Sequence, residues 1–213
     1  EHSAPGFDGV VTVPVLYDRH RKMIVNNESS EIIRMLNKAF DQWGNADVDF
    51  YPQPLRDDID VINQVVYDTV NNGVYRSGFA TTQQAYEKAY AALFGTLDML
   101  ESHLSKQRYL VGDQITEADW RLFPTLLRFD PVYYSHFKCN RQRLIDFPNL
   151  WAYTRELYQV EGVAETVNFD HIKTHYFGSH KMINPTGIVP CGPEIDFAAP
   201  HQRDQDTVNT DAL

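Results

Sequence analysis

The sequence predicts a small α/β unit followed by a larger all-helical one. Two short apolar runs rich in β-branched residues, at 10–17 and 23–25, precede the first helical pattern. From about residue 59 to residue 180, apolar residues recur with helical spacing. A stretch with two prolines and scattered Asp and Asn separates the patterns and is typical of a linker. We therefore expect domains at 1–42 and 58–213, joined by a linker at 43–57.

The first unit is predicted to be β-β-α. Residues 10–17 favour a strand, although Pro14 cannot donate a hydrogen bond to a neighbouring strand. Residues 23–25 are expected to be its hairpin partner. The Asn and Ser side chains at 26–30 are typical helix caps, so a helix should follow.

The second unit is predicted from apolar stripes, which indicate buried helix faces. The first stripe is Ile59, Ile62, Val66 and Val70, and the second is Tyr86, Tyr90, Leu93, Leu97, Leu100 and Leu104. Thr116 and Asp119 have the spacing of a capping box and should begin another helix, in which Arg128 and Asp130 could pair. A further helix is expected at 148–160. Four prolines after residue 184 predict an irregular tail, packed on the body to about residue 203.

The composition excludes several classes of function. The 213 residues include 19 Lys and Arg against 29 Asp and Glu, a net charge of −10. This balance argues against nucleic acid and against an anionic membrane surface as partners, because both need a basic field. No apolar run approaches the roughly 20 residues of a membrane span.

The cysteines indicate a reducing compartment. Cys139 and Cys191 form no Cys-x-x-Cys pair, and two cysteines do not make a disulfide framework. We therefore expect a cytoplasmic protein. The chain opens without Met and without a signal peptide pattern, which led us to expect that an N-terminal segment is missing.

One candidate ligand site lies in the first unit. If the bond before Pro14 is cis, the backbone groups of Val13 could pair with an extended peptide, as a strand edge does. Glu28 and Ser29 fall at a helix start, where free N–H groups favour a carboxylate. The site would suit a small anionic peptide. The alternative is an ordinary strand followed by an ordinary helix cap.

Several longer strings resemble one family. Residues 13–18 (VPVLYD) and 24–36 (IVNNESSEIIRML) resemble the glutathione-binding part of the thioredoxin-like domain of glutathione transferases. The second unit is similar to the glutathionyl-hydroquinone reductases, or Xi-class glutathione transferases. The strings are YDTVNNGVY at 67–75, ADWRLF at 118–123, RFDPVY at 128–133, HFKC at 136–139, ETVNFDH at 165–171, YFGSH at 176–180 and NPTG at 184–187.

The resemblance implies a partial thioredoxin-like domain, an all-α domain of the glutathione transferase type, and a two-step thiol exchange. A cysteine thiolate attacks the sulfur of a glutathionyl-hydroquinone, and the hydroquinone leaves. A second glutathione, the co-substrate, then releases oxidised glutathione. The resemblance also implies a homodimer.

The resemblance further implies site residues. Val13, Glu28 and Ser29 match glutathione-binding positions, with Pro14 in the same segment. Tyr75 and Tyr176 match tyrosines beside the quinol pocket, where a phenol can hydrogen-bond the leaving phenolate; Tyr133 is a third candidate.

The family's Cys-Pro-Trp-Ala type motif is absent, and neither cysteine of this chain matches it. Cys139 lies beside Lys138 and Arg141, which could lower its pKa, but we interpret it as structural. The alternatives are therefore a general glutathione transferase that conjugates electrophiles, or a non-catalytic binder of glutathione or aromatic ligands. His171, His175 and His180 could bind a metal, but we expect none, because the zinc-protease spacing is missing.

Overall fold

The structure is a computed structural model that describes residues 13–204. The chain divides into two compact units, with the boundary between Pro54 and Leu55. The predicted domain bounds, 1–42 and 58–213, stay predictions.

The first unit is a hairpin followed by a helix. Strands β1 (Leu16–Asp18) and β2 (Met23–Asn26) pair antiparallel, with Tyr17 opposite Ile24. The expected strand at 10–17 is thus shorter than predicted: its first three residues lie outside the described part, and pairing begins at Leu16.

Helix α1 (Ser29–Lys38) begins at a cap that the sequence analysis did not assign. The Glu28 carboxylate accepts hydrogen bonds from the backbone N–H of Ser30 at 3.3 Å and from its hydroxyl at 3.1 Å. The expectation of an Asn or Ser cap was therefore wrong. Asn26 instead accepts the backbone N–H of Glu28 at 2.7 Å, so it fixes the residue that does the capping.

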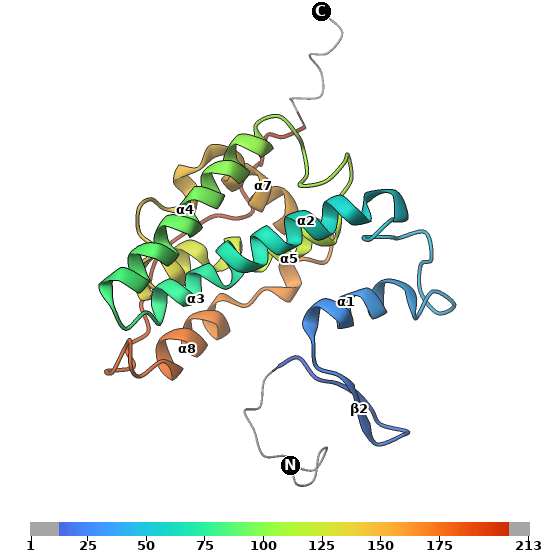
Figure 1. The fold of residues 1–213 in the computed structure, drawn as a ribbon, viewed down its shortest axis with the longest axis horizontal. Helices are drawn as coiled ribbons and strands as arrows, with labels where there is room; N and C mark the ends of the chain where they lie inside the picture. Colours follow the sequence, from blue (N-terminus) through green and yellow to red (C-terminus); the bar gives the residue numbers. More distant parts are fainter. Residues whose placement is uncertain (1–12, 205–213) are drawn as a thin grey trace, which may run out of the picture. The chain divides into compact units, whose positions relative to one another are not determined.

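The second unit is helical (Figure 1). Its α-helices are α2 (Arg56–Val66), α3 (Gly73–Gly78), α4 (Gln83–Leu104), α5 (Glu117–Arg128), α6 (Tyr134–His136), α7 (Pro148–Tyr158) and α8 (Phe169–Ser179). Short 3-10 turns lie at Gln53–Leu55, Leu144–Asp146 and Ala164–Thr166. Two wider π-helical turns, Tyr67–Asn71 and Phe129–Tyr133, follow α2 and α5.

The predicted stripes form the core of this unit. Ile59, Val66 and Val70 are buried, while Ile62 is half-buried. On α4, which packs along α3 (Figure 1), the buried members of the predicted stripe are Leu93, Leu97, Leu100 and Leu104. The tyrosines at the start of α4 are only half-buried, because they lie at the rim of the packed face.

Asp119 links the start of α5 to two other segments. Its carboxylate accepts the backbone N–H of Thr116 at 2.7 Å, as the capping-box spacing predicted. It also accepts the Leu110 N–H at 3.0 Å and the Tyr153 hydroxyl at 2.7 Å. A buried carboxylate needs such partners, since an unpaired one would cost several kcal/mol. The local cap is thus also a tertiary contact.

The expected pairing of Arg128 with Asp130 is wrong. Asp130 accepts the backbone N–H groups of Leu144 and Ile145, at 2.5 and 3.2 Å. Arg128 donates to the Pro124 carbonyl at 2.8 Å. Arg128 ends α5 and Asp130 lies within the π-helical turn that follows, so their side chains reach different neighbours.

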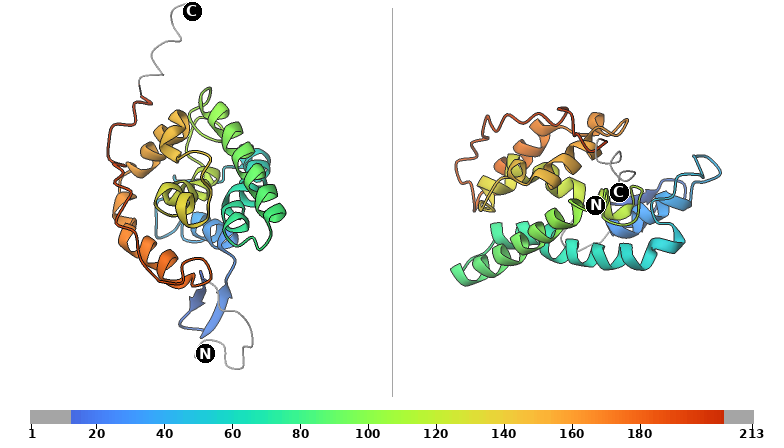
Figure 2. Two further views of the ribbon diagram at one scale, coloured as in Figure 1. Left: turned by 90° about the vertical axis from the view of Figure 1, so that its left-hand side faces the viewer. Right: turned by 90° about the horizontal axis from the view of Figure 1, so that it is seen from above.

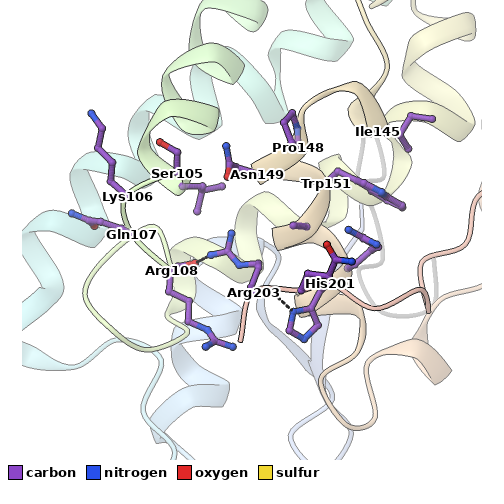
Figure 3. A pocket seen from close by; sticks show the side chains of 14 residues that line it. Ser105, Lys106, Gln107, Arg108, Ile145, Pro148, Asn149, Trp151, His201 and Arg203 are labelled. Atoms are coloured by element: carbon purple, nitrogen blue, oxygen red, sulfur yellow. Dashed lines mark hydrogen bonds between the residues drawn. The ribbon is translucent and has the colours of Figure 1, made fainter. Parts of the chain in front are cut away.

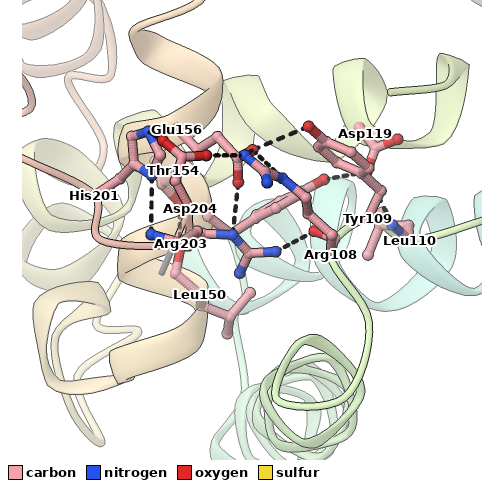
Figure 4. Close-up of polar contacts among 11 residues, drawn as sticks. Arg108, Tyr109, Leu110, Asp119, Leu150, Thr154, Glu156, His201, Arg203 and Asp204 are labelled. Atoms are coloured by element: carbon pink, nitrogen blue, oxygen red, sulfur yellow. Dashed lines mark hydrogen bonds and ion pairs between the residues drawn. The ribbon is translucent and has the colours of Figure 1, made fainter. Parts of the chain in front are cut away.

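The tail is irregular and packs on the helices, as predicted; it runs along the outside of the helical body (Figure 2). Phe197 is buried against Trp151, Tyr158 and Phe169, with ring centroids 5.1–5.4 Å apart. Arg203 donates to Glu156 at 2.6 Å. Arg108 and Tyr109 converge on the same carboxylate (Figure 4), so the tail and the segment after α4 share one anchor.

No helix within residues 13–204 combines the length and the apolar character that a membrane crossing requires.

Candidate functional site

Three tyrosines from separate segments meet in the second unit. Tyr75 lies on α3, Tyr133 ends the second π-helical turn, and Tyr176 lies on α8. The Tyr176 hydroxyl oxygen is 2.5 Å from that of Tyr75 and 2.8 Å from that of Tyr133. The structure therefore brings together all three tyrosines that the sequence analysis singled out.

The π-helical turns help to position these tyrosines. One turn leads into α3, where Tyr75 lies, and the other carries Tyr133 as its last residue. An extra residue in a helical turn rotates everything that follows it, and such turns are frequent at functional sites. The sequence analysis expected regular helices here and missed both turns.

The proton count of the cluster limits what it can do. A phenol has one proton to donate, so Tyr176 donates to at most one of its two neighbours and accepts from the other or from both. Three hydroxyls joined by two hydrogen bonds use two of their three protons. One O–H is left over, and it falls at an end of the chain if the bonds run in one direction. Tyr75 is that accessible end, because it is 38% exposed whereas Tyr133 is 2% exposed.

Burial keeps the inner phenols protonated. Desolvation raises the pKa of Tyr133 well above its ordinary value, and the neighbouring phenol of Tyr176 raises it further. Desolvation likewise raises the pKa of Tyr176. At neutral pH both are therefore uncharged donors, able to stabilise negative charge that develops on a bound oxygen.

Aromatic rings surround the hydroxyls. Phe137 lies 5.3 Å from Tyr75, 5.4 Å from Tyr133 and 5.9 Å from Tyr176, between ring centroids. Phe79 stacks beside Tyr75 with centroids 6.5 Å apart. These are ordinary separations for packed aromatic pairs, so the rings form an apolar surround for the hydroxyls.

Two paired histidines lie beside the cluster, and their pairing was not predicted from the sequence. His136 Nε2 lies 3.1 Å from His180 Nδ1, and the His180 ring contacts Tyr176 with centroids 5.5 Å apart. Desolvation lowers the pKa of His136 to about 4, helped by the neighbouring His180 and Lys138. The pair is thus neutral at pH 7. Its only sequence signal was the two histidines inside family strings.

The histidines singled out as metal candidates do not gather in one place with other ligands. Within residues 13–204, no group of three or more His, Cys, Asp or Glu side chains could hold a metal ion. His175 contacts the ring of Tyr176, with centroids 5.3 Å apart.

Cys139 does not have the environment of a nucleophile. Its side chain is fully buried and unbonded to another sulfur, and desolvation raises its pKa to about 12. Desolvation outweighs any lowering of this pKa by Lys138 and Arg141, and Arg141 donates to Asp98 at 2.8 Å; the interpretation of Cys139 as structural agrees with this environment. Cys191 is a free, exposed thiol in the tail.

The candidate ligand residues of the first unit lie before and at the start of α1. The Val13–Pro14 peptide bond is cis, and the Val13 side chain is 88% exposed. Glu28 is the cap of α1 and Ser29 its first residue. The ligand roles of these four residues stay predictions.

The comparisons with known proteins identify first a class and then a family. Residues 83–156 match the family model described as "Glutathione S-transferase, C-terminal domain". Glutathionyl-hydroquinone reductase YqjG of Escherichia coli is 56% identical over 203 residues, which cover 95% of this chain and 62% of that protein. The glutathione-bound structure of YqjG superposes on this chain with a TM-score of 0.93. The superposition covers 95% of this chain and 66% of the chain in that structure.

Two further similar proteins carry names from the same family. Glutathionyl-hydroquinone reductase PcpF of Sphingobium chlorophenolicum is 59% identical over 189 residues, covering 89% of this chain and 60% of that one. The Xi-class glutathione transferase from Natrialba magadii superposes with a TM-score of 0.89 at 52% identity, covering 92% of this chain and 60% of that one. The chain is similar to glutathionyl-hydroquinone reductases and to Xi-class glutathione transferases. It spans about three fifths of the length of these curated relatives.

The predicted fold class and the family resemblance are confirmed by these matches. The helical unit has the fold of a glutathione transferase C-terminal domain, and the first unit is part of a thioredoxin-like domain.

Proposed function

We propose that the protein reduces glutathionyl-hydroquinones with glutathione, and that this chain's tyrosine cluster binds the hydroquinone. The overall reaction takes one glutathionyl-hydroquinone and one glutathione and gives one hydroquinone and one oxidised glutathione. A sulfur–sulfur bond forms, a carbon–sulfur bond breaks, and the ring carbon takes the proton. The relatives named above carry this activity in their names.

One observation supports the assignment of the cluster: three phenol hydroxyls are joined in a chain whose accessible end is Tyr75. A hydroquinone is a flat ring with oxygens at opposite ends. A neutral O–H donor beside an aromatic wall meets both features. As the ring oxygen gains negative charge, the donor's hydrogen bond strengthens and the step is accelerated.

The test is Tyr176→Phe in the full-length protein. Removing this hydroxyl breaks both hydrogen bonds of the cluster and should lower kcat/KM for a glutathionyl-hydroquinone about 10- to 100-fold. Tyr86→Phe is the matched control, because the Tyr86 hydroxyl donates instead to the Lys138 carbonyl. Unchanged hydroquinone release in Tyr176→Phe, measured by chromatography, would contradict the proposal.

The glutathione site is proposed at Val13, Pro14, Glu28 and Ser29. The Glu28 carboxylate and the Ser29 hydroxyl lie at the start of α1, where the helix dipole favours the carboxylate end of a tripeptide. Ser29→Ala and Glu28→Gln should each raise the Kd for glutathione about tenfold, measured by isothermal titration. Unchanged Kd values in both variants would remove these residues from the site.

A second candidate function is binding without turnover. It is favoured by Cys139, whose burial and raised pKa unsuit it for thiol exchange. A binder would take up glutathione or a hydroquinone in titrations while releasing no oxidised glutathione. Titration together with a measurement of released oxidised glutathione therefore separates the two functions.

We also propose a homodimer in the cytoplasm. The relatives are glutathione transferases, and the free cysteines suit a reducing compartment. Light scattering behind a sizing column tests the dimer, and fractionation of cells tests the location.

A further inference from the structure

A pocket lies in the helical unit and shares no residue with the tyrosine cluster. It has a volume of about 740 Å³. Its walls come from the end of α4 and the segment after it (104–108), from the start of α7 and the turn before it (145–155), and from the tail (201–203) (Figure 3). The volume lies within the range of ligand pockets, roughly 300–1,000 Å³.

The lining of this pocket is basic in an acidic protein. It includes Lys106, Arg108, Arg155 and Arg203, together with His201, and none of its residues is acidic. The whole chain has only 19 Lys and Arg against 29 Asp and Glu. The basic residues are therefore gathered here against the overall balance of charge.

Two of the four cations are paired with carboxylates that are not part of the pocket lining. Arg108 pairs with Glu156 at 2.7 Å and with Asp204 at 2.6 Å. Arg203 pairs with the other oxygen of Glu156 at 2.6 Å. Two carboxylates thus balance two guanidinium groups.

The other two cations have no such partner. Within residues 13–204, neither Lys106 nor Arg155 has a carboxylate oxygen within 4 Å. The pocket consequently keeps about two positive charges that no carboxylate of the described chain pairs with.

Arg155 is held in place without a directly paired carboxylate, and the charge of Asp196 acts on it from beyond 4 Å. Its guanidinium carbon lies 5.0 Å from the centroid of the Trp151 ring, and it donates to the Pro200 carbonyl at 2.8 Å. Its Nε is buried and finds no acceptor. A cation fixed by a ring and a carbonyl loses little rotamer freedom when an anion arrives, which favours binding.

We propose that this pocket binds a small phosphate-bearing anion of about nucleotide size. Arginine presents a planar fork of donors and lysine a point charge, the combination that recognises phosphate groups. The amide side chains of Gln107 and Gln202 in the lining add neutral donors. The proposal is independent of the reaction assigned to the tyrosines.

The test is isothermal titration of the full-length protein with ATP, inorganic pyrophosphate, adenosine and glutathione. ATP and pyrophosphate should bind with one saturable site, and adenosine should not. The affinity for ATP should fall between about 50 and about 300 mM NaCl, because salt screens charge–charge attraction. Glutathione distinguishes phosphate from carboxylate recognition: it should not displace ATP.

Variants locate the binding. Lys106→Gln and Arg155→Gln should each raise the Kd for ATP about 5- to 10-fold. Lys88→Gln is the matched control, since Lys88 is an exposed lysine on α4, about 24 Å along the helix from its end at Leu104. Lys106 is exposed, so its variant also serves if Arg155→Gln fails to fold. The proposal is overturned if ATP does not saturate the protein, if adenosine or glutathione competes with it, or if Lys106→Gln binds like Lys88→Gln.

Discussion

At the scale of single residues, burial decides the charge of side chains in the tyrosine cluster. His136 is 4% exposed and lies among Phe137, Phe177 and His180, so water cannot solvate a charge on it. A neutral imidazole fits such a site, and its Nε2 still pairs with His180. The phenols beside it are kept protonated for the same reason. The cluster is therefore polar but uncharged.

This burial predicts acid sensitivity. An unfolded His titrates near 6.5, whereas the folded pKa of His136 is about 4. Between these values the unfolded chain binds a proton that the folded chain does not, so the free energy of unfolding falls as the pH is lowered. The stability is fully present above pH 6.5 and should be reduced by about 3 kcal/mol near pH 4. Urea unfolding from pH 7.5 to 4 measures it.

The control separates His136 from general acid effects. His136→Phe removes the titrating group and should flatten the pH dependence, although it lowers stability at pH 7. His20→Gln removes an exposed histidine of the hairpin turn and should leave the slope unchanged. An equal slope in His136→Phe and the unmodified protein would show that His136 is not responsible.

At the scale of elements, the helices differ in how closely they approach their neighbours. Gly78 ends α3 where a Cβ would come within 2.2 Å of the Phe137 ring. Gly95 lies inside α4, and a Cβ there would meet nothing within 4 Å. One glycine is required by packing and the other only loosens its helix.

Alanine substitutions should therefore have opposite signs. Gly78→Ala forces the Phe137 ring to move and should destabilise the fold by about 2–3 kcal/mol. Gly95→Ala should stabilise it by about 0.5–1 kcal/mol, because alanine restricts the unfolded chain and favours helix. Thermal and urea unfolding of the two variants give the comparison. A stable Gly78→Ala protein would mean that α3 does not pack on Phe137 as described.

At the scale of the whole molecule, the core belongs almost entirely to the second unit. Among the described residues of the first unit, Ile32 alone is a buried hydrophobic side chain. The other buried hydrophobic residues run from Ile59 to Phe197. A short hairpin with one helix has too little buried surface for a stable fold of its own.

A fragment of residues 55–213 should therefore fold, and a fragment of residues 1–54 should not. The larger fragment is expected to be helical by circular dichroism and to unfold cooperatively in urea. The smaller fragment should show no cooperative transition, since its core is lacking. Gradual unfolding of the 55–213 fragment would contradict this division of the core.

Most elements of the fold could be predicted from the sequence, because their signals are local. The stripes of Ile59 and Leu93 follow from helical spacing, and the start of α5 follows from Thr116 and Asp119. The sequence missed the Glu28 cap and the two π-helical turns. The cap depends on which of several polar side chains forms the hydrogen bond, and the π-helical turns depend on how neighbouring helices pack. The spacing of residues in the sequence does not determine either.

By itself, the sequence determined the two-unit order, the helical pattern, the acidic balance and the family strings, because each is a property of neighbouring residues or of the total. Only the tertiary structure decided that Tyr75, Tyr133 and Tyr176 join through their hydroxyls and that Cys139 is buried with a raised pKa. It also decided that cations from three separate segments line one pocket. Hydrogen bonds, desolvation and fields act through space, and residues up to 101 positions apart become neighbours only when the chain has folded.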